Sequence, residues 1–121
     1  MKGIREMENV NAVVISGNIT RDTQVKEPAS GFKTASFCVA VNKRKKEADG
    51  EYYDAASFVD CELFGSQAEN VGPKLLKGTH VVVQGYLDVD SKKDKDGKTK
   101  KYWKVVATKV DFIARPVPAD D

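Results

Sequence analysis

The run Ser57–Glu69 places a strand pattern directly before a helix signal, and this order restricts the folds that the chain can adopt. The first part, up to Phe64, alternates like a half-buried strand. Ser66 and Glu69 then match the S-x-x-E capping box, in which two side chains satisfy free amides at a helix start. We therefore expect a strand that ends at Phe64 and Gly65, followed by a short helix.

Four further segments have strand patterns, two before this run and two after it. They are residues 10–20, 33–42, 80–90 and 100–113. In 33–42 the odd positions are apolar and the even ones small, which predicts one core-facing side. Gly17 interrupts the first segment and predicts either a bulge or a sharp bend where the sheet curls.

The connecting segments carry turn and breaker residues. Pro28–Gly31 marks a turn, and residues 43–56, centred on Asp49-Gly50, are interpreted as a long mobile hairpin. Gly72-Pro73 interrupts the helix, so we expect either one turn and a break or a restart at Pro73. A charged loop with Asp96-Gly97 joins the last two strands.

The resulting order is three strands, a helix and two strands, in a chain of 121 residues that suits one domain. This order predicts an all-β fold, a five-stranded Greek-key barrel of the oligonucleotide-binding (OB) kind, with one short helix between strands three and four. An SH3-like barrel is the rival, but the helix argues against it. We expect the barrel to span residues 10–114, between a disordered extension (1–9) and a short tail (115–121).

Charge is uneven along the chain, although the net charge is only +2. One basic block comprises Lys43, Arg44, Lys45 and Lys46. A second, residues 92–104, holds seven lysines and two aspartates, a net charge of +5. Each block alone could be a solvated loop. Together with an aromatic ring at the end of an amphipathic strand, they indicate binding of single-stranded nucleic acid, through base stacking and phosphate contacts.

The sequence gives little support for other classes of function. Cys38 and Cys61 lack metal-ligand spacing, and His80 is the only histidine, so we expect no metal and no cofactor. We expect both cysteines to be small core or sheet residues without a disulfide. No nucleophile-base set can be named, so we expect no enzyme. No apolar run approaches a membrane span or signal peptide, which predicts a cytoplasmic protein without membrane contact.

Several short motifs together resemble the bacterial-type single-stranded DNA-binding proteins, over roughly residues 10–114. No single motif is specific for this family, but the order and spacing of the motifs together are specific. They are Val14–Asp22 (VISGNITRD), Ala35–Asn42 (ASFCVAVN), Leu63-Phe64-Gly65 with Ala68-Glu69, Leu76-Lys77-Gly78, Val83-Gln84-Gly85, and Asp96-Gly97 before Tyr102.

The resemblance implies an OB barrel, usually a homotetramer, that binds single-stranded DNA with little sequence preference in replication, recombination and repair, in association with the nucleoid. It implies base stacking by Phe64 and Phe58, and basic contacts by Lys26 and Lys77. From periodicity alone, Phe64 could equally be a core residue. The further expected contacts are Tyr86, Trp103, Lys43, Arg44, Lys45, Lys46, Lys92 and Lys93.

The chain also departs from the family pattern. Lys45 and Lys92 stand where stacking aromatics are common, and Asp88 and Asp90 where arginines are common. Tyr86 should share a strand face with both aspartates. Of the adjacent residues Tyr102 and Trp103, we expect only one to point outward.

These departures leave alternatives open. A replication-restart accessory protein of the same fold would be a dimer that binds DNA weakly, and an RNA-binding or purely protein-interacting barrel is the other choice. Family members carry a tail with an acidic tip that recruits partner proteins. This chain stops at Asp120-Asp121 without such a tip, which indicates either a shortened form or a paralogue that binds DNA without recruiting partners.

Overall fold

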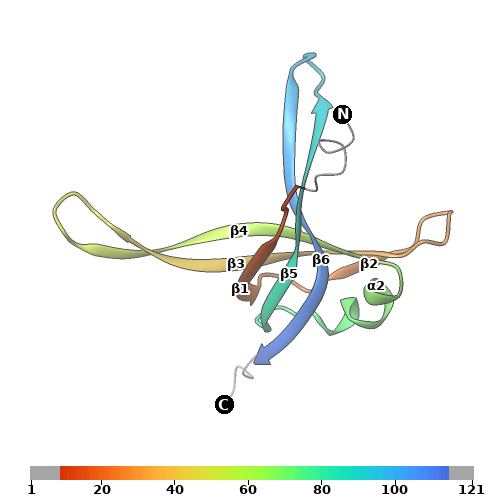
Figure 1. Ribbon diagram of the computed structural model, residues 1–121, viewed down its shortest axis with the longest axis horizontal. Coiled ribbons are helices and arrows are strands. Elements are labelled where there is room, and N and C mark those ends of the chain that lie inside the picture. The colour runs from red at the N-terminus through yellow and green to blue at the C-terminus, as the bar shows by residue number, and fades with distance from the viewer. Residues whose placement is uncertain (1–8, 115–121) are drawn as a thin grey trace.

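A computed structural model describes residues 9–114, which form a strongly curled sheet with two long projecting hairpins (Figure 1). The helical segments are α2 (Ser66–Asn70) and the 3₁₀ turn η1 (Gly72–Lys74). The strands are β1 (Val13–Ile19), β2 (Gln24–Lys26), β3 (Thr34–Lys46), β4 (Tyr52–Phe64), β5 (His80–Lys93) and β6 (Thr99–Ala114).

The sheet closes on itself. Its strand order is β1-β5-β6-β4-β3-β2, and an additional pairing of β1 with β3 completes the ring. The β4–β6 pair is parallel and the other pairs are antiparallel. The predicted five-stranded barrel with a short helix before the fourth long strand is therefore confirmed. The short strand β2, which pairs with the start of β3, is an addition that the sequence did not predict.

Gly17 marks the place where β1 passes from one neighbour to the other. Residues 13–18 pair with β5 without a register shift, so β1 has no bulge there. Asn18 and Ile19 also pair with β3. A Cβ atom on Gly17 would lie 2.1 Å from the carbonyl oxygen of Ala40, closer than any side chain tolerates. Of the two predicted alternatives, the bulge is therefore wrong, and glycine permits the close approach of β1 to β3.

The core lies inside the ring and uses one side of each strand. In β3 and β4 the odd-numbered residues point inward, as the alternation in 33–42 predicted. Both cysteines are free and buried, Cys61 in the core and Cys38 on the other face of β3. Burial raises the pKa of the Cys61 thiol to about 12. The largest fully buried side chains are Phe37, Ile19, Leu63, Leu75, Val39, Val81 and Val83.

The predicted hairpin over residues 43–56 is confirmed, but the strands extend further into it than the sequence patterns indicated. The β3–β4 ladder continues without interruption to the pair Lys46 and Tyr52, so the turn occupies only residues 47–51. The β5–β6 ladder likewise continues to Lys93 and Thr99. Backbone pairing persists beyond the barrel although no core lies beneath it, which is why the apolar pattern that predicts strands is absent there.

The predicted capping box is also wrong. Ser66 is the first residue of α2, and Gly65 is the N-cap, without a side-chain hydrogen bond. The Glu69 amide donates to the carbonyl of Gly65 at 3.2 Å, and its carboxylate pairs with Lys33 at 3.1 Å. The break after one turn is confirmed, because α2 ends at Asn70 and η1 begins at Gly72 with proline near its start.

Some expectations fall on residues that the structure does not describe. The N-terminal extension, apart from Asn9, and the tail 115–121 lie outside the described residues. Within residues 9–114, no helix is long and apolar enough to cross a membrane.

Candidate nucleic-acid interface

Phe58 and Phe64 lie on the outer face of β4, opposite to the core. They are six residues apart, which corresponds to about 20 Å along a strand. Phe58 is 69% exposed and Phe64 is half-buried. Their direct partners on β3 are the small residues Ala40 and Thr34, which leave the rings uncovered. The alternation of large inward and small outward residues in β3 therefore opens the surface on which both rings lie.

Phe64 has an aromatic neighbour on one side and a cation on the other. The ring of Phe32, in the turn before β3, lies parallel to it, with centroids 6.1 Å apart and planes inclined by 12°. The Lys104 ammonium, from β6, lies 6.0 Å from the centroid of Phe64. Strand register also places Lys26 on this face, because Lys26 pairs with Thr34 and Thr34 with Phe64.

Phe58 lies beside a hollow of about 180 Å³ where β5 and β6 leave the barrel. Trp103, which is 58% exposed, lines the same hollow from β6. A flat ring at each side of a shallow opening is an arrangement that accepts another flat group. The other lining residues are Val59, Asp60, Leu87, Lys104 and Val105.

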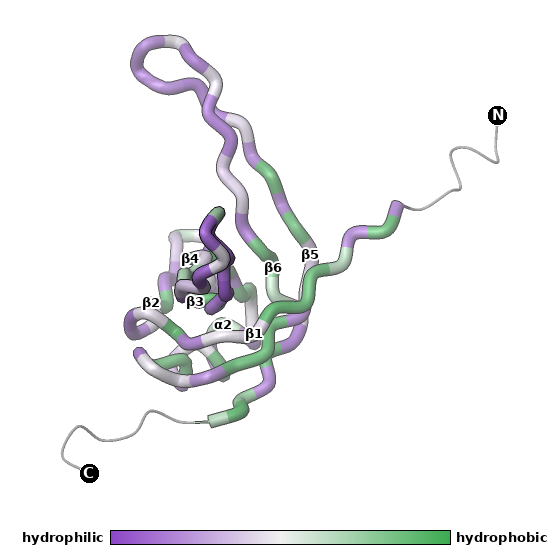
Figure 2. Tube along the Cα trace, turned by 90° about the vertical axis from the view of Figure 1, so that its left-hand side faces the viewer, coloured by the Kyte–Doolittle hydropathy of each residue, from purple (hydrophilic) through white to green (hydrophobic). Residues whose placement is uncertain are grey.

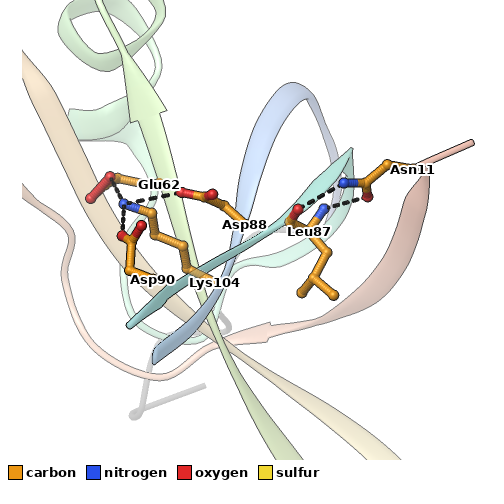
Figure 3. Close-up of polar contacts among 6 residues, drawn as sticks. All are labelled: Asn11, Glu62, Leu87, Asp88, Asp90 and Lys104. Atoms are coloured by element: carbon orange, nitrogen blue, oxygen red, sulfur yellow. Dashed lines mark hydrogen bonds and ion pairs between the residues drawn. The ribbon is translucent and has the colours of Figure 1, made fainter. Parts of the chain in front are cut away.

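Lys104 is surrounded by carboxylates (Figure 3). Its ammonium lies 3.1 Å from Glu62, 3.9 Å from Asp88 and 4.0 Å from Asp90. The hydrogen bond that Glu62 accepts raises the pKa of Lys104 above its ordinary value, so the ammonium keeps its charge at neutral pH. One cation against three carboxylates leaves this part of the surface negative. The two aspartates thus lie on the outer face with Tyr86, as predicted.

The basic block 43–46 is divided between the two faces of its hairpin. Arg44 and Lys46 share the outer face, and both cations lie over the ring of Tyr52, at 4.8 and 5.8 Å from its centroid. Lys43 and Lys45 point to the other side, where the Lys43 ammonium donates to the hydroxyl of Ser57 at 2.9 Å. Only half of the predicted block therefore shares a face with Phe58 and Phe64.

The β5–β6 hairpin carries the second basic block. Lys92 and Tyr102 lie on the outer face, with the ammonium 5.9 Å from the ring centroid. Lys93 and Trp103 lie on the opposite face. The prediction that only one of Tyr102 and Trp103 lies on the outer face is confirmed, and that residue is Tyr102. Both rings are nevertheless exposed, at 52% and 58%. Beyond the barrel both faces of the hairpin meet solvent.

Lys77 is a predicted contact that belongs to neither hairpin. It lies in the segment between η1 and β5, where its backbone amide donates to Asp22 at 2.9 Å. Two residues near the predicted ones were missed, Phe32 and Tyr52, and Lys104 was predicted only as part of the basic block 92–104. Phe32 follows Gly31 in a turn, and an apolar ring at a turn was the signal that could have identified it.

Residues 9–114 contain no group of three or more histidine, cysteine, aspartate or glutamate side chains that could hold a metal ion. The chemistry available on the outer face is thus that of flat rings, ammonium and guanidinium groups, and carboxylates.

Comparison with known proteins gives a consistent result. The model of the single-strand binding protein family matches residues 10–113. The single-stranded DNA-binding protein of Wolinella succinogenes is 34% identical over 103 residues, which cover 85% of this chain and 64% of the relative. That of Borreliella burgdorferi is 37% identical over 90 residues, 74% of this chain and 60% of the relative. The chain thus spans about three fifths of the length of these relatives.

A solved structure supports the fold. The complex of Plasmodium falciparum SSB with ssDNA superposes with a TM-score of 0.80 at 19% identity, over 90% of this chain and 99% of that chain. The family model covers nearly all the residues that the structure describes, and the barrel is the fold seen in that complex. This chain belongs to the single-strand binding protein family.

Proposed function

We propose that this protein binds single-stranded DNA with little sequence preference and protects it during replication, recombination and repair. The observation that carries the proposal is the pair of rings on the outer face of β4, Phe58 and Phe64, left uncovered by small residues on β3. Every base offers a flat face, so stacking does not discriminate strongly between sequences. The cations Lys26, Arg44, Lys46 and Lys92 share that face and suit the phosphates.

The remaining predicted contacts belong to the same proposal, and they differ in how close they lie to the two rings. Tyr86 and Trp103 lie close to the proposed path, on the outer face and beside the Phe58 hollow. Lys43, Lys45 and Lys93 project from the reverse sides of the hairpins and would serve a strand that wraps around them. Lys77 is the most remote from the rings. The protein acts as a binding protein without enzymatic activity, in the cytoplasm, on the nucleoid.

Assembly as a homotetramer, or as a dimer, is part of the proposal. Residues 13–17 of β1 pair only with β5 and leave one strand edge open. Val10 and Val14 next to that edge are 95% and 67% exposed. An open edge with apolar side chains is a surface that a second copy can cover. The names of the relatives favour this function over that of a replication-restart accessory protein, which the sequence left open.

Equilibrium binding tests the proposal. Labelled oligo-dT, oligo-dC and oligo-dA of one length should bind with similar affinity, and a duplex of that length much more weakly. Phe58→Ala should weaken oligo-dT binding by roughly 1–3 kcal/mol with an unchanged melting temperature, because the ring is exposed. Leu76→Ala, which removes an exposed apolar side chain from a loop, is the control and should bind normally.

Two results would contradict the proposal: equal affinity for duplex and single strands, or a Phe58→Ala protein that melts earlier and binds as before. Light scattering on the same samples gives the subunit number. The mass of a tetramer would support the homotetramer, and the mass of a dimer would support the dimer.

A further inference from the structure

Phe32 is an exposed ring held beside Phe64. It lies in the turn between β2 and β3 and is 57% exposed. The two ring planes are nearly parallel, and their centroids are 6.1 Å apart, within the range of stacked aromatic pairs. The pair therefore presents two similarly oriented flat groups on one surface.

The backbone fixes the position of this ring. The amide of Gly65 donates to the carbonyl of Lys33 at 2.8 Å, which ties the end of β4 to the residue after Phe32. Gly65 has φ of 65°, and a Cβ atom built on it would lie only 3.4 Å from the Phe32 ring. Gly31, directly before Phe32, also has a positive φ, of 78°. The segment is thus shaped by two glycines so that Phe32 lies over the end of β4.

Cations flank the pair on both sides. Phe32 precedes β3, so it lies on the β3 side of Phe64, whereas Lys104 approaches from β6. Lys26 lies one strand beyond β3, at the level of Thr34 and Phe64. At about 4.8 Å between strands, Lys26 is about 10 Å from Phe64 across the sheet. Flat rings with ammonium groups within that range match the base and phosphate of neighbouring nucleotides.

We propose that Phe32 is a base-stacking residue and that Phe32 and Phe64 form a two-ring platform for unpaired bases. This inference rests on the proposed function, and it adds a residue that belongs to no strand. The parallel planes allow consecutive bases of one strand to stack in the same orientation. The platform also gives a role to an apolar ring that is exposed in a turn.

An oligonucleotide without bases separates stacking from other effects. Phe32→Ala should bind oligo-dT about 5- to 100-fold more weakly than the wild type. Its affinity for an abasic sugar-phosphate oligomer of the same length should equal that of the wild type, since stacking is then impossible. Phe32→Leu keeps an apolar side chain but no flat ring and should resemble Phe32→Ala. Phe32→Trp should bind at least as tightly as the wild type.

The outcomes distinguish the two proposals. If the wild type fails to bind oligo-dT, the proposed function is wrong. If the wild type binds and Phe32→Ala binds equally well, or if Phe32→Leu retains full affinity, only the stacking role of Phe32 is overturned. A similar loss on the abasic oligomer would also overturn it, by making Phe32 a support for the fold. If Phe32→Ala melts early, the affinities of Phe32→Leu and Phe32→Trp for oligo-dT decide whether Phe32 stacks on a base.

Discussion

The barrel and its two hairpin arms obey different physical constraints. The arms are residues 42–54 of the β3–β4 hairpin and 89–103 of the β5–β6 hairpin, which extend away from the barrel (Figure 1). In the barrel, inward residues such as Ala35, Val39 and Val83 are fully buried. In the arms nearly every residue is exposed on both faces. Figure 2 shows the outer part of the β5–β6 hairpin as predominantly hydrophilic.

This difference separates stability from binding. Burial of apolar area stabilises the barrel and restricts its inward positions. The arms bury little, so their composition is free to serve a polyanion, and the two basic blocks lie there. The rings of Phe58 and Phe64 lie at the border, on a barrel strand but on its outer face.

Val83 and Val89 test this separation most strongly, because they are the same residue type on one strand. Val83 is fully buried and Val89 is 39% exposed. Val83→Ala should lower the free energy of unfolding by about 2–3 kcal/mol, through lost methyl burial and the cavity left behind. Val89→Ala should change it by less than about 0.5 kcal/mol. Urea denaturation measures both, and equal losses would mean that the arm is packed as tightly as the barrel.

The same contrast explains which parts of the fold the sequence could predict. Strand 33–42 was identified because its odd residues meet a core, which produces a period of two. Residues 43–46 and 52–56 pair just as regularly, yet no core selects their side chains, and the predicted strands did not include them. The capping box failed because Glu69 pairs with Lys33, which lies just before β3 and is far from Glu69 in the sequence, so no local pattern contains this contact.

Prediction of the candidate site had a similar limit. Strand parity on β4 identified Phe58 and Phe64 as a pair on one face, and the structure agrees. Phe32 and Lys104 reach that pair from other parts of the chain, through the β3–β4 and β4–β6 pairings. Their places depend on which strands become neighbours, so the spacing of residues along β4 could not show that they meet Phe64. Base contacts by any of these residues remain a prediction.

The two faces of the β3–β4 arm allow a comparison at constant charge. Arg44→Gln with Lys46→Gln removes two cations from the face of Phe58, and Lys43→Gln with Lys45→Gln removes two from the other. If single strands follow the outer face, the first pair should reduce the slope of log affinity against log salt by about 1.4, at ~0.7 per phosphate contact. The second pair should change it less. Equal changes would indicate wrapping around the whole arm.

The last comparison concerns the carboxylates where the β5–β6 arm joins the barrel. Asp88 and Asp90 each lie about 4 Å from the Lys104 ammonium. On the proposed DNA path they repel phosphates and also occupy Lys104. Asp88→Asn with Asp90→Asn should therefore tighten oligo-dT binding several-fold, more at 20 mM than at 200 mM salt, because exposed charges are screened within about 10 Å at 0.1 M.

Stability should fall by no more than about 1 kcal/mol, as for other surface pairs, and the remaining Glu62 contact keeps Lys104 in place. Asp111→Asn is the matched control, since Asp111 is an exposed aspartate that pairs with Lys109 at 3.8 Å elsewhere on β6. It loses the same kind of ion pair and should leave affinity unchanged. If the double variant instead changed the oligomer mass and kept its DNA affinity at low salt, these aspartates would belong to a protein interface. The path of the single-stranded DNA would then avoid this part of β5.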